Sequence, residues 1–156
     1  MFHLGLTPQH PCDYLPDEQS RSLVVIDEHR LSPEAYEFLL ARGFRRSGSH
    51  AYRPWCDHCR QCVAVRIPVS RFHPNRSQRR TLERNRDLEE RWTEARGLND
   101  EQWTLYHDYL QARHGESGMA KSDRAASEEF LFSPWARTRL MELRLGQKLL
   151  AVAVTD

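Results

Sequence analysis

Lysine is scarce in this chain of 156 residues, because Lys121 and Lys148 are the only two among 23 basic residues. Arginine therefore carries nearly all of the positive charge, and its guanidinium can bind phosphate or carboxylate oxygens through two parallel hydrogen bonds. The formal net charge is only +1, so the composition as a whole does not indicate a nucleic-acid-binding protein. Genome composition explains the arginine excess equally well, but a clustering of arginines needs a separate explanation.

Long apolar runs are also missing. No stretch is long enough to cross a membrane, and residues 1–12 have neither the basic start nor the apolar centre of a secretory signal. We therefore expect a cytoplasmic protein without a membrane partner, in which thiols stay reduced. Glycine-rich phosphate loops, nucleophile elbows and H-E-x-x-H motifs are absent as well, so nothing local supports hydrolytic or nucleotide-dependent chemistry.

Four cysteines are present, and Cys56, Cys59 and Cys62 recur at every third residue. Clustered thiols in a reducing compartment favour metal binding. Tetrahedral zinc takes four thiolates, and Cys12 could supply the fourth from a distant loop. Iron–sulfur clusters also use four cysteines at short spacings, so the pattern leaves the identity of the metal open. Four reduced structural thiols are the alternative, because the usual second C-x2-C pair is missing.

A dense group of arginines follows the cysteines: Arg66, Arg71, Arg76, Arg79, Arg80, Arg84 and Arg86. On a helix, Arg76, Arg80 and Arg84 would share one face, where like charges repel by roughly a few tenths of a kcal/mol per pair. Phosphate groups would offset this repulsion by releasing their counterions. The alternative is an ordinary solvated helix face whose arginines pair with nearby carboxylates such as Glu83.

Hydrophobic periodicity predicts an α+β fold. Strands are expected over residues 21–27, 63–69 and 90–95, with hairpins over 44–53 and 138–154. Helices are expected over 33–42, from residue 75 or 77 onward with Leu82 and Leu88 facing inward, over 99–113 and over 127–132. The loop 114–123, with two glycines, is predicted to be either an ordinary loop or a lid.

Three stretches carry a family resemblance: CDYLP, GFRRSGSHAYRPWCDHCRQCVAVRIPVSRF and NRSQRRTLERNRDL. They resemble the amino-terminal half of bacterial aminoacyl-tRNA–protein transferases, in particular the aspartate/glutamate leucyltransferase branch, which is related to the eukaryotic arginyltransferases. The resemblance extends through RHGESGMAKSD to the final GQKLLAVAVTD. One departure is Leu15, which stands where eukaryotic relatives have the second cysteine of a C-x2-C pair.

The resemblance implies an enzyme that transfers leucine from leucyl-tRNA to the α-amino group of proteins beginning with Asp or Glu. Such acceptors are thereby marked for N-degron proteolysis, and no nucleotide or coenzyme is expected. The implied fold is α+β, with a cysteine-bearing region, residues 1–72, packed on an acetyltransferase-like region that starts at residues 73–156. This second region is expected to be incomplete, because the family's chains continue further.

The resemblance also suggests roles for particular residues. Zinc or an iron–sulfur cluster would be held by Cys12, Cys56, Cys59 and Cys62. The tRNA backbone would contact Arg76, Arg79, Arg80 and Arg84. The acidic side chain of the acceptor would meet Arg53 or Arg66, and no residue is identified as the catalytic base. Three alternatives remain: a metal-stapled RNA-binding module without transferase activity, arginine as the donor residue, and an acyl-coenzyme A acyltransferase, which would lack its pyrophosphate-binding stretch.

Overall fold

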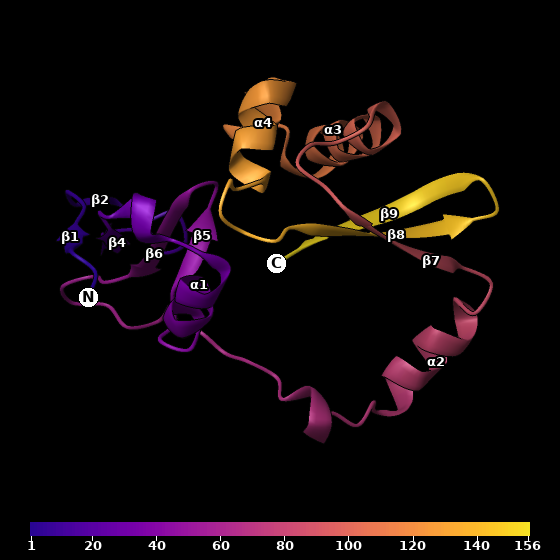
Figure 1. Cartoon of the computed structure of the whole chain (residues 1–156), viewed down its shortest axis with the longest axis horizontal. Coiled ribbons are helices and arrows are strands. Elements are labelled where there is room, and N and C mark those ends of the chain that lie inside the picture. The colour runs from indigo at the N-terminus through magenta and orange to yellow at the C-terminus, as the bar shows by residue number, and fades with distance from the viewer. The chain divides into compact units, whose positions relative to one another are not determined.

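The computed structural model describes all residues, 1–156, and the chain folds into two compact units. Unit 1 comprises Met1–Arg66 with Pro134–Ala136, and unit 2 comprises Ile67–Ser133 with Arg137–Asp156. Helices and antiparallel sheets occur in both, as expected for an α+β fold (Figure 1). The regional boundary expected at residue 72 stays a prediction. None of the helices combines the length and the apolar character that a membrane crossing requires.

Unit 1 is built on a four-stranded antiparallel sheet with strand order β1-β4-β6-β5. Its strands are β1 (Leu4–Leu6), β4 (Ser22–Val25), β5 (Arg45–Ser47) and β6 (His50–Pro54). β5 and β6 form the hairpin expected from the sequence, and Gly48 supplies the positive φ of 56° at its turn. A smaller antiparallel pair joins β2 (His10–Pro11) to β3 (Gln19–Ser20).

The helix of unit 1, α1 (Pro33–Leu40), has the predicted start. The Ser32 hydroxyl accepts a hydrogen bond from the Ala35 N–H at 3.2 Å, as an N-cap should. The core of this unit consists of Val25, Leu31, Tyr36, Leu39, Phe44 and Ala51. Trp135 joins this core from far along the chain, because its ring lies 5.0 Å from that of Tyr36 and its Nε1 donates to the Ser49 carbonyl at 2.9 Å. A 3₁₀ turn, η1 (Glu28–Arg30), precedes α1.

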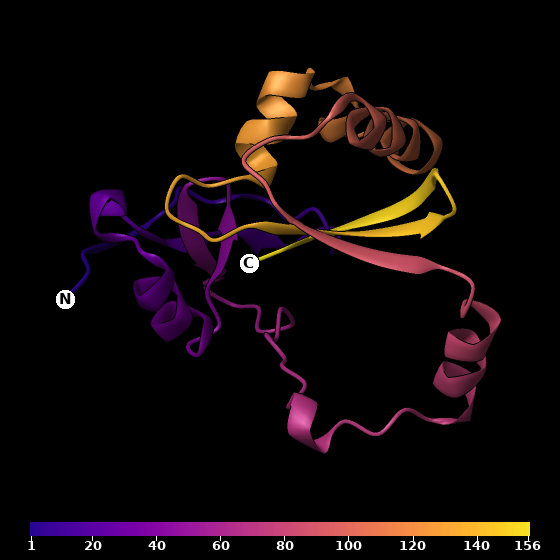
Figure 2. The ribbon, with the colours of Figure 1, turned by 45° about the vertical axis from the view of Figure 1, so that its right-hand side comes forward.

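Unit 2 contains a three-stranded antiparallel sheet with strand order β7-β8-β9. The strands are β7 (Glu89–Glu94), β8 (Arg139–Leu145) and β9 (Lys148–Thr155), and Gly146, with φ of 58°, turns the hairpin between the last two. Two helices, α3 (Asp100–His114) and α4 (Arg124–Leu131), lie on one face of this sheet in both views (Figures 1 and 2). A 3₁₀ turn, η3 (Met119–Lys121), connects them, and the core beneath contains Leu98, Phe132 and Leu140.

The strand predicted over residues 63–69 is wrong. This segment is irregular and leads into the 3₁₀ turn η2 (Val69–Arg71). The apolar residues do alternate, but their side chains are 69–87% exposed in Val63, Val65, Ile67 and Val69. A period of two makes a strand only where a neighbouring strand supplies hydrogen bonds, and none pairs with this segment.

The arginine-bearing helix, α2 (Arg76–Arg84), starts where the sequence predicts. Asn75 forms a capping box with Gln78, whose N–H donates to the Asn75 side chain at 2.9 Å. The prediction that Leu82 faces inward is wrong, because its side chain is 67% exposed, whereas Leu88 is half-buried. Every residue of α2 is exposed, and the helix stands away from the sheet of its unit in both views (Figures 1 and 2).

A buried ion pair lies where β8 meets α3. Arg144 donates to Glu142 at 2.7 Å and to Glu101 of α3 at 2.5 Å, while Gln102 donates to Glu142 at 2.7 Å. The hydrogen bond from Arg144 lowers the pKa of both carboxyl groups. The same two carboxylates raise the pKa of the Arg144 guanidinium. Leu149 of β9 also donates its N–H to Glu101 at 3.3 Å, so this network fixes α3 against both strands.

This network predicts a loss of stability in acid. The pKa of Glu142 is lower in the folded protein than in the unfolded chain, so its contribution is complete above the ordinary glutamate value of about 4.3. That contribution is lost as the pH falls through the folded-state pKa. We expect the free energy of unfolding, measured by urea denaturation, to decline as the pH is lowered from about 5 to about 3.

Two variants test the cause of this decline. Glu142→Gln should be less stable at pH 7 by about 1–3 kcal/mol, and its stability should vary less with pH in the acid range. Glu94→Gln, which removes an exposed carboxyl from the same sheet, should keep the pH dependence of the unchanged protein. Equal pH dependence in Glu142→Gln and the unchanged protein would contradict the assignment.

Candidate functional site

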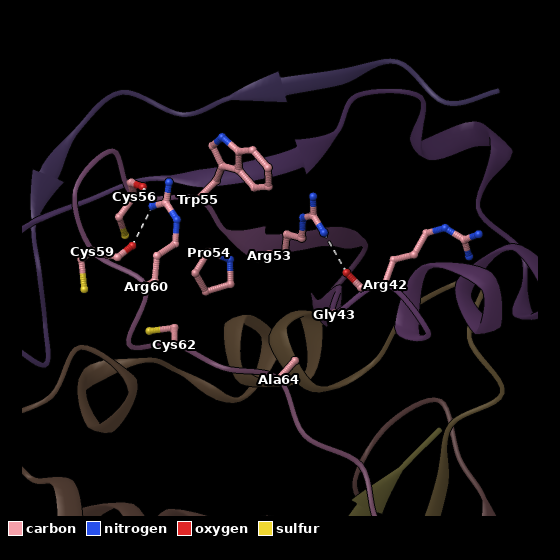
Figure 3. A pocket seen from close by; sticks show the side chains of 10 residues that line it. All are labelled: Arg42, Gly43, Arg53, Pro54, Trp55, Cys56, Cys59, Arg60, Cys62 and Ala64. Carbon is pink, nitrogen blue, oxygen red and sulfur yellow. Dashed lines mark hydrogen bonds between the residues drawn. The ribbon is translucent and has the colours of Figure 1, made fainter.

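Three cysteines border one cavity in unit 1. The cavity has a volume of about 270 Å³ and is lined by Cys56, Cys59 and Cys62, which follow strand β6 (Figure 3). Arg60 closes the loop that carries them, because its guanidinium donates to the carbonyl of Cys56 and, at 2.8 Å, to that of Cys59. Both acceptors are backbone carbonyls of the same loop, so the Arg60 side chain stabilises the turn that carries the cysteines.

Cys12 lies on the neighbouring hairpin and does not line the cavity. Its N–H donates to the Glu18 carbonyl at 2.9 Å, which extends the pairing of β2 with β3. The hairpin is joined to the cysteine loop through Asp57, which accepts hydrogen bonds from Gln9 at 2.6 Å and from Arg21 at 3.3 Å. All four thiols are free of disulfide bonds.

The four cysteine thiols are of the chemical type that binds zinc or iron, but they are not arranged as a complete metal site. Four thiols are what structural zinc or an iron–sulfur cluster uses. Among residues 1–156, however, no three His, Cys, Asp or Glu side chains form a group that could hold a metal ion. The structure therefore gathers three of the predicted ligands around one cavity, and metal binding by the four cysteines stays a prediction.

Arginines give this cavity its charge. Arg42, Arg53 and Arg60 line it together with Trp55, and none of the three pairs with a carboxylate. Arg53 donates to the Arg42 carbonyl at 2.9 Å, and its guanidinium lies 4.6 Å from the centre of the Trp55 ring (Figure 3). Its Nε is buried without a hydrogen-bond partner. Of the three, Arg53 is half-buried, whereas Arg42 and Arg60 are exposed. Cations that meet only neutral groups leave a positive potential for an anion.

The two arginines predicted to bind the acceptor are thus in different settings. Arg53 lines the cavity, whereas Arg66 is exposed beyond it. Arg42 and Arg60 were missed as site residues. Arg60 could have been found from its position inside the C-x2-C-x2-C repeat. Arg42 lies just after α1 and lines the cavity together with Gly43, where the chain turns with a φ of 79°, and no local pattern indicated this.

On α2, the predicted tRNA-binding arginines form an exposed row. Arg76, Arg80 and Arg84 recur at every fourth residue, and none of them has an ion pair within the chain. The one helix carboxylate, Glu83, instead pairs with Arg86 at 2.8 Å. Arg79 donates back to the Pro74 carbonyl at 2.5 Å. The alternative of a helix face neutralised by neighbouring carboxylates therefore does not describe these three guanidinium groups, which are open to phosphate.

Two family descriptions match the chain in order. Residues 10–80 match "Arginine-tRNA-protein transferase, N terminus", and residues 101–156 match "Arginine-tRNA-protein transferase, C terminus". The first range holds the four cysteines and the start of α2, and the second holds α3, α4, β8 and β9. The two units of the structure thus carry parts of one family pattern.

Individual relatives give a narrower comparison. An aspartate/glutamate leucyltransferase of Stenotrophomonas maltophilia (strain K279a) is 49% identical over 161 residues, which cover 99% of this chain and 64% of that protein. Proteins of the same name from Vibrio cholerae serotype O1 (strain M66-2) and Shewanella putrefaciens (strain CN-32 / ATCC BAA-453) are 42% and 44% identical, over 66% and 64% of their lengths. The chain thus spans 64–66% of the length of these curated relatives.

Proposed function

The chain belongs to the family of aminoacyl-tRNA–protein transferases, and on this premise we propose that the protein transfers leucine from leucyl-tRNA to the amino-terminal Asp or Glu of acceptor proteins. One observation carries the proposal: identity of 42–49% over 98–99% of the chain to relatives whose name states both leucine and the two acidic acceptor residues. The products would enter N-degron proteolysis in the cytoplasm, in keeping with the family.

The proposed reaction is aminolysis of an ester. The neutral α-amine of the acceptor attacks the carbonyl carbon of the leucyl ester, which forms the new C–N bond. The C–O bond to the tRNA ribose then breaks, and the proton lost by the amine goes to the leaving ribose oxygen. Because the tRNA ester is already activated, neither ATP nor a coenzyme is required. The oxyanion of the tetrahedral intermediate needs hydrogen-bond donors. No residue of this chain is assigned as the base.

We assign tRNA binding to α2. Arg76, Arg80 and Arg84 are exposed and unpaired, and Arg79 lies beside them on the next part of the helix surface. Guanidinium groups that have no carboxylate partner lose nothing when they bind phosphate, apart from hydration. The mutual repulsion along this row would fall on binding, since each phosphate contact neutralises one arginine and releases counterions.

We assign recognition of the acceptor's acidic side chain to Arg53. Its guanidinium is held over Trp55, is partly shielded from water and has a buried Nε without a partner, so a carboxylate would find a fixed and weakly solvated donor. Arg42 and Arg60 add positive charge to the same cavity. Arg66, exposed on the segment after the cysteine loop, is the second candidate for this role.

The cysteines and the second region complete the proposal. Cys12, Cys56, Cys59 and Cys62 would hold zinc or an iron–sulfur cluster that pins the hairpin of Cys12 to the cysteine loop, where Asp57 already joins them. This role is structural and takes no part in the chemistry. From the family resemblance, residues 73–156 would begin an acetyltransferase-like region.

A metal-stapled RNA-binding module without transferase activity is the second candidate. The exposed arginine row of α2 favours it as much as it favours an enzyme, since both must grip RNA phosphates. The two candidates differ in what happens to the aminoacyl group, so an assay for the transfer of labelled leucine to a peptide separates them.

The full-length protein should transfer labelled leucine from leucyl-tRNA to peptides that begin with Asp or Glu, and not to a matched peptide that begins with Asn. Arg53→Ala should raise the KM for the Asp peptide by about tenfold, because one charge-assisted hydrogen-bond partner is lost. The KM for leucyl-tRNA should stay the same. Scintillation counting of the peptide measures both quantities.

Arg53→Lys serves as the matched control, since it keeps the charge without the planar fork and should have an intermediate KM. If neither leucine nor arginine reaches any peptide, the enzyme is ruled out and the RNA-binding module remains. Equal use of the Asp and Asn peptides by the unchanged protein would remove the acceptor role of Arg53 alone.

Replacing Arg80 and Arg84 together by alanine should weaken tRNA binding and make it less dependent on salt. If each arginine contacts one phosphate, the slope of log Kd against log salt concentration should flatten by about two units. Arg86→Ala is the control, because that guanidinium already pairs with Glu83 and should change the slope less. An unchanged slope in the double variant would place the tRNA elsewhere.

Elemental analysis of anaerobically purified protein should find zinc, or iron with acid-labile sulfide, in a fixed ratio to the chain. Cys59→Ser and Cys62→Ser should each lower that content strongly, because thiolates are the proposed ligands. His58→Ala, in the same loop, should retain the metal. Protein without zinc or iron would overturn the metal proposal while leaving the transferase proposal in place.

A further inference from the structure

A second cavity lies in unit 2 among α3, η3 and α4. Its volume is about 370 Å³, and its lining includes Tyr106 of α3, Gly118 and Met119 at the start of η3, and Ser127 and Phe130 of α4. Met119 and Phe130 are 41% and 43% exposed, so the apolar wall is open to a ligand from solvent. Neither the chemistry above nor the binding of tRNA phosphates uses this cavity.

The hydroxyl of Ser127 has no hydrogen-bond partner. This side chain is 3% exposed, and its Oγ is a buried polar atom without a donor or acceptor beside it. The sequence suggested that Ser127 starts a helix, but α4 starts three residues earlier, where Asp123 caps it by accepting from the Ala126 N–H at 2.8 Å. Ser127 is therefore free of a capping role, and buried polar groups without partners point to a missing ligand or water.

No charged side chain lines this cavity. Burial raises the pKa of Tyr106, so its hydroxyl is neutral at physiological pH. A guanidinium group placed here would lose its hydration and find no carboxylate, whereas a branched aliphatic group would contact Met119 and Phe130. The lining thus favours an aliphatic aminoacyl group over an arginyl group.

The wall formed by the loop 114–123 is already in place. Gln111 of α3 donates to the Ala120 carbonyl at 2.8 Å, and Ala120 is buried. The Ser122 hydroxyl donates to the Gly118 carbonyl at 3.1 Å, which closes the turn around Met119. These bonds position the loop residues that line the cavity on this side, and the choice between an ordinary loop and a lid stays a prediction.

We infer that this cavity binds the leucyl group of the donor, with the isobutyl side chain against Met119 and Phe130 and the uncharged α-amine donating to Ser127 Oγ. The inference rests on the proposed transfer of leucine. It makes Gly118, Met119, Ser127 and Phe130 specificity-determining residues, and it explains why the enzyme would select leucine in a family whose description names arginine.

Gly118→Leu tests the space. A side chain fits here without strain, because Gly118 has a helical φ of −57° and a Cβ would meet no heavy atom within 4 Å. The added side chain should fill part of the cavity. With one leucine-accepting tRNA charged in turn with leucine, valine or arginine, the full-length variant should show a KM for the leucyl form raised about tenfold. The preference for leucine over the smaller valine should fall, and binding of the uncharged tRNA should stay the same.

Ser127→Ala tests the hydroxyl separately. Because Ser127 Oγ has no partner in the protein, this variant should be as stable as the unchanged protein in thermal unfolding. Its KM for the leucyl donor should rise about tenfold with kcat little changed. Glu116→Leu is the matched control for Gly118→Leu. It adds a leucine side chain to the loop 114–123 at an exposed position outside the cavity.

The outcomes separate the two hypotheses. If the unchanged protein transfers no amino acid, the proposed function fails and the cavity has no donor to bind. If the unchanged protein transfers leucine, and both variants use the leucyl, valyl and arginyl donors with the same KM values as Glu116→Leu, the donor site lies elsewhere. If Gly118→Leu does not fold, as judged by circular dichroism, Ser127→Ala alone decides.

Discussion

The buried pair of Glu142 and Arg144 is the constraint on which unit 2 depends. Polar residues on the inner face of a strand are costly unless each finds its partners, and here Glu101 and Gln102 supply them from the first turn of α3. The position of α3 over the sheet is thereby set by hydrogen bonds of defined length and direction. Tyr106 lies one turn further along the same helix, so the network also fixes one wall of the second cavity.

The arginines of this chain fall into two groups, which are distinguished by their partners. Arg144, Arg124 and Arg86 pair with carboxylates and serve the fold or the helix surface. The arginines of the first cavity donate to backbone carbonyls, and the four arginines of α2 have no ion pair. A guanidinium without a carboxylate keeps its charge available, so it is in the second group that we propose the binding sites for acidic acceptors and phosphates. Lysine could not replace these residues, since it lacks the planar fork.

Local signals predicted much of the fold. The Ser32 cap, the hairpin around Gly48 and the alternation of β8 and β9 each depend on interactions close in sequence, and the structure confirms them. The segment 63–69 has an equally clear alternation and forms no strand, because a strand also needs a partner that no local pattern reveals. Leu82 was misplaced for the same reason, since α2 has no neighbouring element against which to bury it.

The candidate sites were predictable to different degrees. Cysteine spacing predicted one side of the first cavity. Arg42, which follows the carboxyl end of α1, could not be foreseen as a lining residue. The cavity in unit 2 had no sequence signal at all. Its unpartnered hydroxyl could not be foreseen, because α4 starts at Arg124 rather than at Ser127, so Ser127 is a buried helix residue and not the cap. Likewise, β8 has apolar residues on both faces, so its pattern alone could not indicate that Glu142 and Arg144 are the buried side.

The return of Pro134–Ala136 to unit 1 has a consequence for how this protein can be divided. A gene fragment that stops at Arg66 encodes six strands and the helix α1 but omits the indole that packs on Tyr36 and donates to the Ser49 carbonyl. Such a fragment would leave an aromatic-sized gap in its own interior. Unit 1 therefore cannot be moved into another protein as the contiguous segment 1–66. Recombination or truncation would also have to retain a tryptophan that is encoded some seventy codons downstream.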